Sequence, residues 1–153
     1  HPGCEERGFY TGYMDAVIRY ERTVDHVLAV AHKPEPMPDD DWDAFLGVLR
    51  ETVETHGKAH VIVAAHGQGG PDVSQRARLS QLGSEVGEIK MAVVTDSAFL
   101  RGTVTALRWM KTIDAQSFAC RDEDKAINFL GLDREQGVKT LAILHSLAAA
   151  SES

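Results

Sequence analysis

The residues with the clearest potential for chemistry are Asp96, Ser97 and Arg101, which follow the apolar run Met-Ala-Val-Val-Thr that ends at residue 95. A serine beside a carboxylate, with an arginine four residues later, suits a phosphoacceptor whose added phosphate the guanidinium would hold. The same Asp and Ser suit an N-cap, because their side-chain oxygens accept hydrogen bonds from the unpaired amides at a helix start. Both interpretations place this group in the turn between a strand and a helix.

A second group is the glycine-rich turn His-Gly-Gln-Gly-Gly, which begins at His66 and contains Gly67, Gly69 and Gly70. Pro71 follows, and proline is favoured in the first turn of a helix. Backbone amides at such a helix start are able to bind an anion, and the alternative is a flexible turn with no ligand. The glycine spacing does not match the dinucleotide-binding fingerprint, and the Gly-x-Ser-x-Gly turn of α/β-hydrolases is absent from the sequence.

Histidine and cysteine provide weaker candidates. His32 and His66 each end a strand-like run, and in neighbouring strands their imidazoles would approach each other. No third ligand is evident, so we expect no metal site. Cys120 has no dyad partner at a readable spacing, and we predict a buried, inert thiol. The other cysteine, Cys4, lies far away in the sequence; two distant cysteines do not form a disulfide framework and fit a reducing cytoplasm.

Hydrophobic periodicity predicts the elements that position these groups. Strands are predicted over 16–22, 26–32, 60–66, 91–95 and 114–120. Helices are predicted over 39–56, 71–82, 98–110 and 122–130, and from 133 to the fraying C-terminal tail. Asp39, Asp40 and Asp41 are interpreted as a cap and as favourable first-turn charge for the first helix.

Three further patterns concern the faces of these elements. The first strand alternates Arg19 and Glu21 with apolar residues, as an edge strand exposed to water on one side would. The second helix has a thin apolar face formed by Val73, Ala77 and Leu82. The last helix is predicted to open with a capping box over residues 133–136.

The predicted order is a hairpin followed by alternating helices and strands, which indicates an α/β domain with a mostly parallel sheet and an antiparallel edge. Ligands of such sheets bind beyond the carboxyl ends of the parallel strands. We therefore expect one rim of candidate ligand- or partner-binding residues. Its members are His66, Gly67, Gly69, Gly70, Asp96, Ser97, Arg101 and Arg108. The basic side of the 98–110 helix, with Trp109, would face a protein partner or an anionic lipid headgroup, or else water.

Composition limits the class of protein. The chain has 153 residues, a formal net charge of −7 and 43% hydrophobic residues, which is typical of one globular domain. The acidic charge argues against a nucleic-acid partner, and no apolar run approaches a membrane span. Well-patterned sequence begins at Met14, so residues 1–13 are interpreted as a poorly ordered leader or a non-native addition, residues 14–132 as the domain and residues 133–153 as a helical extension.

These features together resemble a known family. The segment Val-Val-Thr-Asp-Ser ending at Ser97, followed by Arg101-Gly102 and Thr105-Ala106-Leu107, is similar to the bacterial single-domain SpoIIAA-like group of the STAS-like superfamily. The similarity covers about residues 16–132. It implies a STAS-like mixed five-stranded sheet with flanking helices, in a fold related to that of CRAL-TRIO lipid-binding domains.

The resemblance also implies a function. Many relatives are non-enzymatic regulatory or binding modules, and anti-sigma-factor antagonists carry an Asp-Ser-Ser/Thr-Gly-type phosphorylation motif after the third strand. That position here reads from His66 to Ser74 without the motif, which leaves Ser74 and Ser97 as candidate phosphoacceptors.

We therefore expect a cytoplasmic regulatory module in bacterial signalling that binds a protein partner or forms a homodimer. It would have no cofactor and no catalytic residues, since the rim lacks a nucleophile, base and orienting group together. The helix after Asp133 extends beyond the usual end of the family and is interpreted as a docking or dimer-forming addition. The alternatives are a domain that binds a lipid, nucleotide or other small anion, and a small hydrolase or transferase.

Overall fold

The computed structural model describes residues 16–152, so the expectations for residues 1–13 and Met14 lie outside the described part of the chain. Within it, five strands form one sheet in the order β1-β2-β3-β4-β5. The strands are β1 (Ile18–Val24), β2 (Val27–His32), β3 (Lys58–Ala64), β4 (Glu88–Val94) and β5 (Asp114–Phe118). β1 pairs antiparallel with β2, and all later neighbours pair in parallel, so the predicted hairpin and parallel sheet are confirmed.

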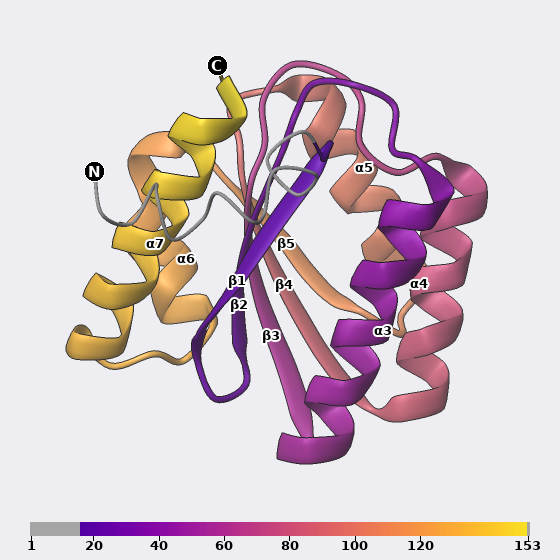
Figure 1. Cartoon of the computed structure of the whole chain (residues 1–153), viewed down its shortest axis with the longest axis horizontal. Coiled ribbons are helices and arrows are strands. Elements are labelled where there is room, and N and C mark those ends of the chain that lie inside the picture. Colours follow the sequence, from indigo (N-terminus) through magenta and orange to yellow (C-terminus); the bar gives the residue numbers. More distant parts are fainter. Residues whose placement is uncertain (1–15, 153) are drawn as a thin grey trace.

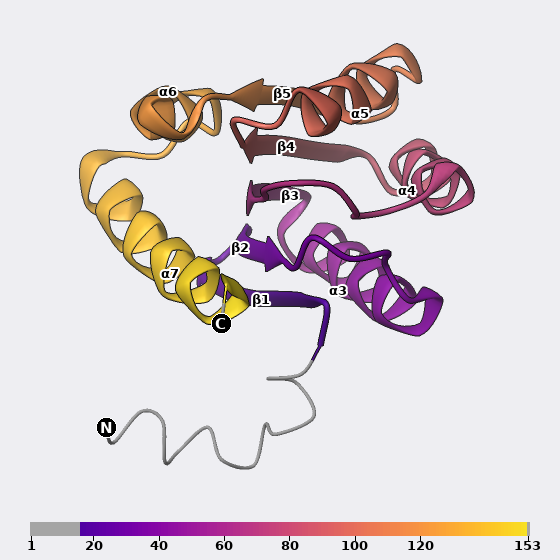
Figure 2. The same ribbon diagram turned by 90° about the horizontal axis from the view of Figure 1, so that it is seen from above.

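Helices cover both faces of the sheet, which gives three layers (Figures 1 and 2). One face carries α3 (Asp39–His56), α4 (Val73–Val86) and α5 (Ala98–Trp109). The opposite face carries α6 (Glu123–Phe129) and α7 (Arg134–Glu152), and a short 3₁₀ turn, η2 (Cys120–Asp122), leads into α6. The expected fold class, a STAS-like mixed five-stranded sheet with flanking helices, is therefore confirmed.

Each face of the sheet has its own hydrophobic core, because successive residues of a strand point to opposite faces. The larger core joins the sheet to α3, α4 and α5 and includes Leu28, Val61, Met91, Phe45, Leu79 and Leu107. The second core joins the sheet to α6 and α7 and includes Ala29, Ile62, Ala92, Ile127, Leu144 and Leu147.

The start of α3 differs from the prediction. Pro38 is the N-cap residue, and no side chain caps the helix. The three aspartates do lie in the first turn, where the helix dipole favours negative charge. Asp39 accepts hydrogen bonds from Gln75 and Arg78, so its carboxylate ties α3 to α4 and does not cap its own helix.

The predicted apolar face of α4 is wrong at Val73 and Ala77 and correct at Leu82, which is buried. Val73 is 70% exposed and Ala77 is also exposed, whereas Gln75 and Leu79 are buried. Asp72 is the N-cap, in a capping box with Gln75, which rotates a polar residue toward the core. The Gln75 side chain donates to the Met37 carbonyl at 2.8 Å and to the Asp39 carboxylate, so its burial is compensated by hydrogen bonds that sequence periodicity cannot reveal.

The alternation in β1 correctly predicted an edge strand, but the exposed side expected for it is wrong at Arg19. Arg19 is only 4% exposed, because α7 lies across β1 and β2. The Thr140 hydroxyl of α7 donates to the Thr23 hydroxyl of β1 at 2.9 Å. Leu144 and Leu147 of α7 are buried in the second core, so much of the apolar face of this helix is used within the chain.

The C-terminal capping box is confirmed. The Asp133 carboxylate accepts from the Gln136 amide at 2.8 Å, and the Gln136 side chain accepts from the Asp133 amide.

No helix in the described part of the chain combines the length and the apolar character that a bilayer crossing requires.

Candidate functional site

The turns after β3 and β4 meet at the carboxyl edge of the sheet, as predicted. The Ser97 hydroxyl donates to the Gly67 carbonyl at 2.8 Å and so joins the two turns directly. An open hollow lies between them and is lined by His66, Gly67, Gln68, Asp96, Ser97, Phe99 and Cys120. The rim therefore exists as one surface, and four of the eight candidate residues line its hollow.

Ser97 is the N-cap of α5, which confirms one of the two interpretations of this residue. Its hydroxyl oxygen accepts a hydrogen bond from the Leu100 amide at 3.3 Å. Its single hydrogen is donated to the Gly67 carbonyl, which is not a base. The hydroxyl is thus oriented away from any activating group, and activation by a neighbouring base is the arrangement that a serine nucleophile requires. The use of Ser97 as a phosphoacceptor stays a prediction.

Asp96 and Cys120 form a second connection across the rim. The Asp96 carboxylate accepts from the Cys120 backbone amide at 3.1 Å. Hydrogen bonds from the Cys120 amide and thiol lower the pKa of Asp96, and the positive charges of Arg101 and Arg121 act in the same direction. Asp96 therefore stays ionised at neutral pH, and its carboxylate links the turn after β4 to the turn after β5.

The predicted burial of Cys120 is wrong, since this residue is exposed. The edge position of β5 and the sharp turn into η2 leave its side chain at the surface. Partial desolvation and the neighbouring Asp96 raise the pKa of the thiol. A raised pKa reduces the thiolate fraction at neutral pH, which is the opposite of what a catalytic cysteine needs.

The glycine turn is packed against the preceding loop and does not form an open anion cradle. A Cβ on Gly69 would lie 2.5 Å from the Glu35 carbonyl oxygen, and the Gly70 amide donates to that oxygen at 3.1 Å. The capping box of Asp72 and Gln75 occupies the start of α4. The glycines thus permit close packing, and the nearest ready-made anion site is filled by the chain's own carboxylate.

The remaining candidates are dispersed. Arg101 lies in the first turn of α5, exposed and close enough to Asp96 to affect its pKa. Arg108 lies in the last turn of α5, so the structure does not bring it to the rim. Ser74 is exposed in the first turn of α4, outside the hollow, and its phosphorylation stays a prediction.

Among the described residues, no group of three or more histidines, cysteines or carboxylates is placed to hold a metal ion. His32 is buried, with Nδ1 hydrogen-bonded to the Lys33 carbonyl at 3.0 Å. Burial lowers the pKa of His32, and the nearby His66 lowers it further.

Sequence reasoning missed one prominent residue, Phe99. Its side chain is 54% exposed and lines the rim hollow, and Trp109 at the other end of α5 is 80% exposed. Both residues fall outside the buried Leu100–Val104–Leu107 stripe, so helical spacing was a usable signal. We call Phe99, Arg101, Arg108 and Trp109 the α5 surface.

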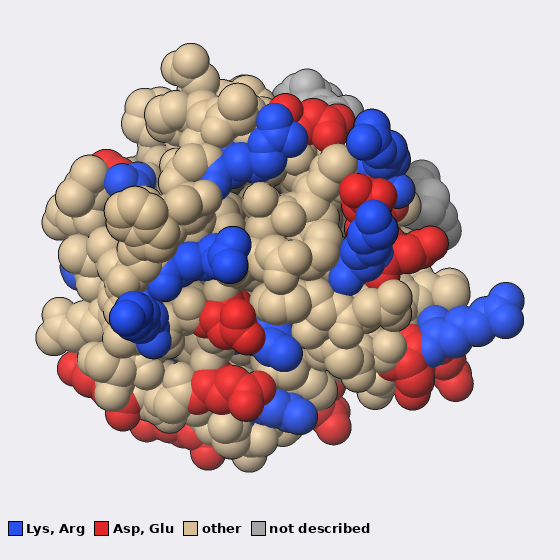
Figure 3. Space-filling view, turned by 180° about the vertical axis from the view of Figure 1, so that it is seen from behind, with Lys and Arg blue, Asp and Glu red and all other residues tan. Residues whose placement is uncertain are grey.

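The α5 surface combines aromatic and basic side chains on a chain of acidic net charge. A rise of about 1.5 Å per residue separates Phe99 from Trp109 by about 15 Å along the helix axis. In Figure 3 the molecule is seen from behind, so α5 lies in the left half of the view. The basic side chains in that half are separated by neutral surface, and acidic side chains gather at the lower edge.

Comparison with known proteins gives one match. The model of a family described as SpoIIAA-like matches residues 28–131, from β2 to the second residue after α6. No curated protein and no solved structure matches the chain. The matched range includes both rim turns and the whole of α5, and ends before α7.

Proposed function

The chain belongs to the SpoIIAA-like family, and from this premise we propose that it is a non-catalytic regulatory module that acts in bacterial signalling by binding a protein partner. The observation that carries the proposal is the α5 surface, where Trp109, 80% exposed, lies between the flank with Arg101 and Arg108 and the flank with Phe99, which is 54% exposed. Aromatic residues and arginine are the types enriched at the energetic centres of protein interfaces.

The chemistry of the rim supports a binding role over catalysis. The Ser97 hydroxyl is used by a helix amide and a carbonyl, and the Asp96 carboxylate is held by Cys120. The thiol pKa is raised, so Cys120 is not activated. A hydrolase or transferase needs a nucleophile, a base and an orienting group in mutual contact, and these rim groups are instead paired for structural purposes.

The α5 surface also indicates the chemistry of the partner that would bind it. The buried stripe of α5 leaves Arg101 and Arg108 on one flank of the exposed side, while Trp109 lies near its centre and Phe99 on the other flank. A complementary protein would present carboxylates to the arginines and an apolar pocket to the aromatic rings. A cytoplasmic protein with such a patch is the partner that this proposal favours over a second copy of the chain.

The test is affinity capture from the bacterial lysate with three baits, quantified by mass spectrometry. The wild-type chain is compared with the double variant Phe99→Ser/Trp109→Ser and with Val138→Ser. Val138 is 65% exposed on α7, in the opposite layer, and is therefore a matched control for the loss of an exposed apolar residue. We expect a partner that wild type and the control retain equally and that the double variant retains at least tenfold less.

Equal recovery of every captured protein by all three baits would contradict the proposed surface. Chemical turnover by the purified chain that Ser97→Ala or His66→Ala abolishes would contradict the non-catalytic role. Circular dichroism of each bait confirms that the comparison is made between folded proteins.

A further inference from the structure

His60 lies near the amino end of β3, at the end of the sheet opposite to the rim, and is only 5% exposed. Its imidazole contacts two other segments. Nδ1 lies 3.2 Å from the carbonyl oxygen of Leu130, the residue that follows α6. Nε2 lies 2.6 Å from a carboxylate oxygen of Glu88 on β4. His60 therefore connects the sheet to the short segment that joins α6 to α7, which we call the α6–α7 junction (residues 130–133).

Both partners of His60 are acceptors, and this determines its charge in the structure. A carbonyl oxygen only accepts, and so does an ionised carboxylate. The hydrogen bond from His60 lowers the pKa of Glu88, and the positive charges of Lys58 and Lys90 act in the same direction, so Glu88 is ionised at neutral pH. A neutral imidazole has one N–H group and the imidazolium has two. The two hydrogen bonds therefore require the positively charged imidazolium.

The end of α6 is a favourable place for positive charge. The last carbonyl oxygens of a helix carry partial negative charge. Lys90 of β4 donates to the Phe129 carbonyl at 3.2 Å, and its Nζ lies 5.0 Å from the centre of the Phe129 ring. His60 donates to the carbonyl of the next residue, Leu130. Two cations from adjacent strands thus hold the α6–α7 junction against the sheet.

The groups around His60 leave Glu88 as the acidic partner that retains its second proton. The His26 ring lies edge-on to the His60 ring, with 4.8 Å between the ring centres. Burial lowers the pKa of His26, and the positive charge of His60 lowers it further. Among the described residues, neither α6 nor α7 brings a charged side chain into hydrogen-bond contact with His60. The other charged or titratable groups that act on His26, Glu88 or Lys90 are Asp25, His56, Lys58 and Asp114.

Loss of one proton from His60 has a defined structural consequence. A hydrogen bond to a carboxylate is stronger than one to a neutral carbonyl, and the bond to Glu88 is the shorter of the two. The remaining proton therefore stays on Nε2. Nδ1 then presents a lone pair to the Leu130 carbonyl oxygen, and two acceptors cannot bond to each other. Only Lys90 then anchors the end of α6.

We propose that His60, Glu88 and the Leu130 carbonyl form a pH-sensitive clasp, which holds the α6–α7 junction on the sheet while His60 carries two protons and releases it when one is lost. Histidine is the side chain whose charge ordinarily changes between about pH 5 and 8. α7 follows the junction directly and packs on β1 and β2, so the clasp controls how firmly this layer is attached. It is independent of the α5 surface, which lies on the opposite face of the sheet (Figure 2).

The test is NMR of the unmodified chain, labelled with ¹⁵N, from about pH 5 to about pH 9, a range that brackets the usual histidine transition. We expect His60 to carry protons on both ring nitrogens at the acidic end and on Nε2 alone at the alkaline end. The Gly131 and Leu132 amides donate to carbonyls of α6 and report on the junction. Their protection from hydrogen exchange should fall about tenfold as His60 loses its proton, because one buried hydrogen bond is lost. The Met110 amide, which closes α5 on the other face, should keep its protection.

A pair of variants tests the role of the carboxylate. Glu88→Gln removes the negative charge that retains the second proton on His60. Glu85→Gln is the matched control, since Glu85 is a partly exposed carboxylate of α4 that bonds to Arg50 and has no contact with His60. Glu88→Gln should move the loss of protection at Gly131 and Leu132 to lower pH, and Glu85→Gln should leave it at the wild-type pH.

Four results would overturn the clasp. The first is a His60 ring whose Nδ1 carries no proton at any pH in the range. The second is full protection of Gly131 and Leu132 after His60 has lost its proton. The third is an equal loss of protection at Met110. The fourth is a transition that lies at the same pH in Glu88→Gln as in the wild-type chain.

Discussion

The two faces of the sheet are built from different side chains. Toward α6 and α7 the central strands present Ala29, Ala31 and Ala92, together with Val27, Ile62 and Val94. Toward α3, α4 and α5 the same strands present valine, leucine and methionine. Small side chains allow helices to lie close to the sheet, whereas large ones hold the helices further away and must interlock to fill the space.

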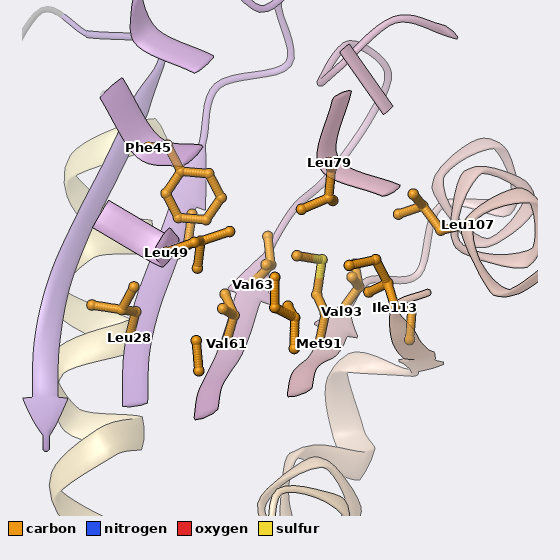
Figure 4. Packing of buried hydrophobic residues seen from close by; sticks show 14 of the residues in the cluster. Leu28, Phe45, Leu49, Val61, Val63, Leu79, Met91, Val93, Leu107 and Ile113 are labelled. Atoms are coloured by element: carbon orange, nitrogen blue, oxygen red, sulfur yellow. The ribbon is translucent and has the colours of Figure 1, made fainter. Parts of the chain in front are cut away.

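This difference separates stability from binding. The alanine-bearing face is closed by α7, whose residues Leu144 and Leu147 are buried. The opposite face retains a small cavity of about 60 Å³, lined by side chains that include Val63, Leu79 and Leu107 (Figure 4), and it carries the helix with the α5 surface. The surface suited to binding thus lies on the face where packing is incomplete.

The largest expected effect compares one leucine from each face. Leu144 and Leu79 both have 0% exposure, but only Leu79 borders the cavity. Leu144→Ala should lower the free energy of unfolding by about 2–5 kcal/mol. Leu79→Ala should cost less, because a side chain beside a void has fewer packing contacts to lose. Urea denaturation measures both, and equal losses would contradict the contrast between the faces.

The next effect uses enlargement of a side chain in place of truncation. Ala29→Val on the closed face should cost about 1–3 kcal/mol through overpacking. Val63→Ile adds a methylene toward the cavity and should stabilise the protein by about 0.5–1 kcal/mol. The same denaturation measurement applies to both variants. Destabilisation by both variants would show that the cavity wall is already fully packed.

A smaller effect concerns the caps of the helices on the two faces. Ser97→Ala removes the N-cap of α5, and Asp133→Ala removes that of α7. Each should cost about 1 kcal/mol of unfolding free energy. Only Ser97→Ala also removes the bond to Gly67, so it alone should speed amide hydrogen exchange in the 66–70 turn. Faster exchange there in Asp133→Ala would contradict a local role for the caps.

The smallest effect is a pH dependence that originates at the cavity wall. Burial lowers the pKa of His32 below its unfolded value of about 6.5. Between the two pKa values the unfolded chain binds more protons, so the free energy of unfolding must fall as the pH decreases from about 7. Burial also lowers the pKa of His26, so the loss of stability that His26 causes on acidification persists in a His32 variant. His32→Leu should therefore lose less stability on acidification than wild type, as measured by denaturation at each pH.

Much of the fold follows from the sequence because its signals are local. The alternation of apolar residues in strands and the 3.6-residue period of α5 depend on which face meets the core. The capping box at Asp133 depends on residues only three positions apart. Such patterns predicted the order of elements and the meeting of the two rim turns.

The errors have the opposite origin. Gln75 is buried because Met37 and Asp39 of another element accept its hydrogen bonds, and Arg19 is buried because α7 returns to β1. Cys120 is exposed because β5 is an edge strand. Each outcome depends on contacts between segments distant in sequence, which periodicity does not contain.

The candidate site was predicted as a location and less well as a set of roles. The positions of Asp96, Ser97 and the glycine turn follow from their places after parallel strands. Their mutual hydrogen bonds, and the packing of Gly69 on Glu35, depend on loop conformations that residue type alone does not fix.

The order of the strands has a consequence for how the chain is made. Each strand pairs with its predecessor in sequence, so the sheet is able to grow as the polypeptide leaves the ribosome. The alanine-bearing side of the N-terminal hairpin must nevertheless wait for α7, and the threonine pair that joins them is separated by 117 residues. Until that helix is synthesised, nascent protein exposes an uncovered apolar surface, and its arrival ties both ends of the described chain into one cooperative unit.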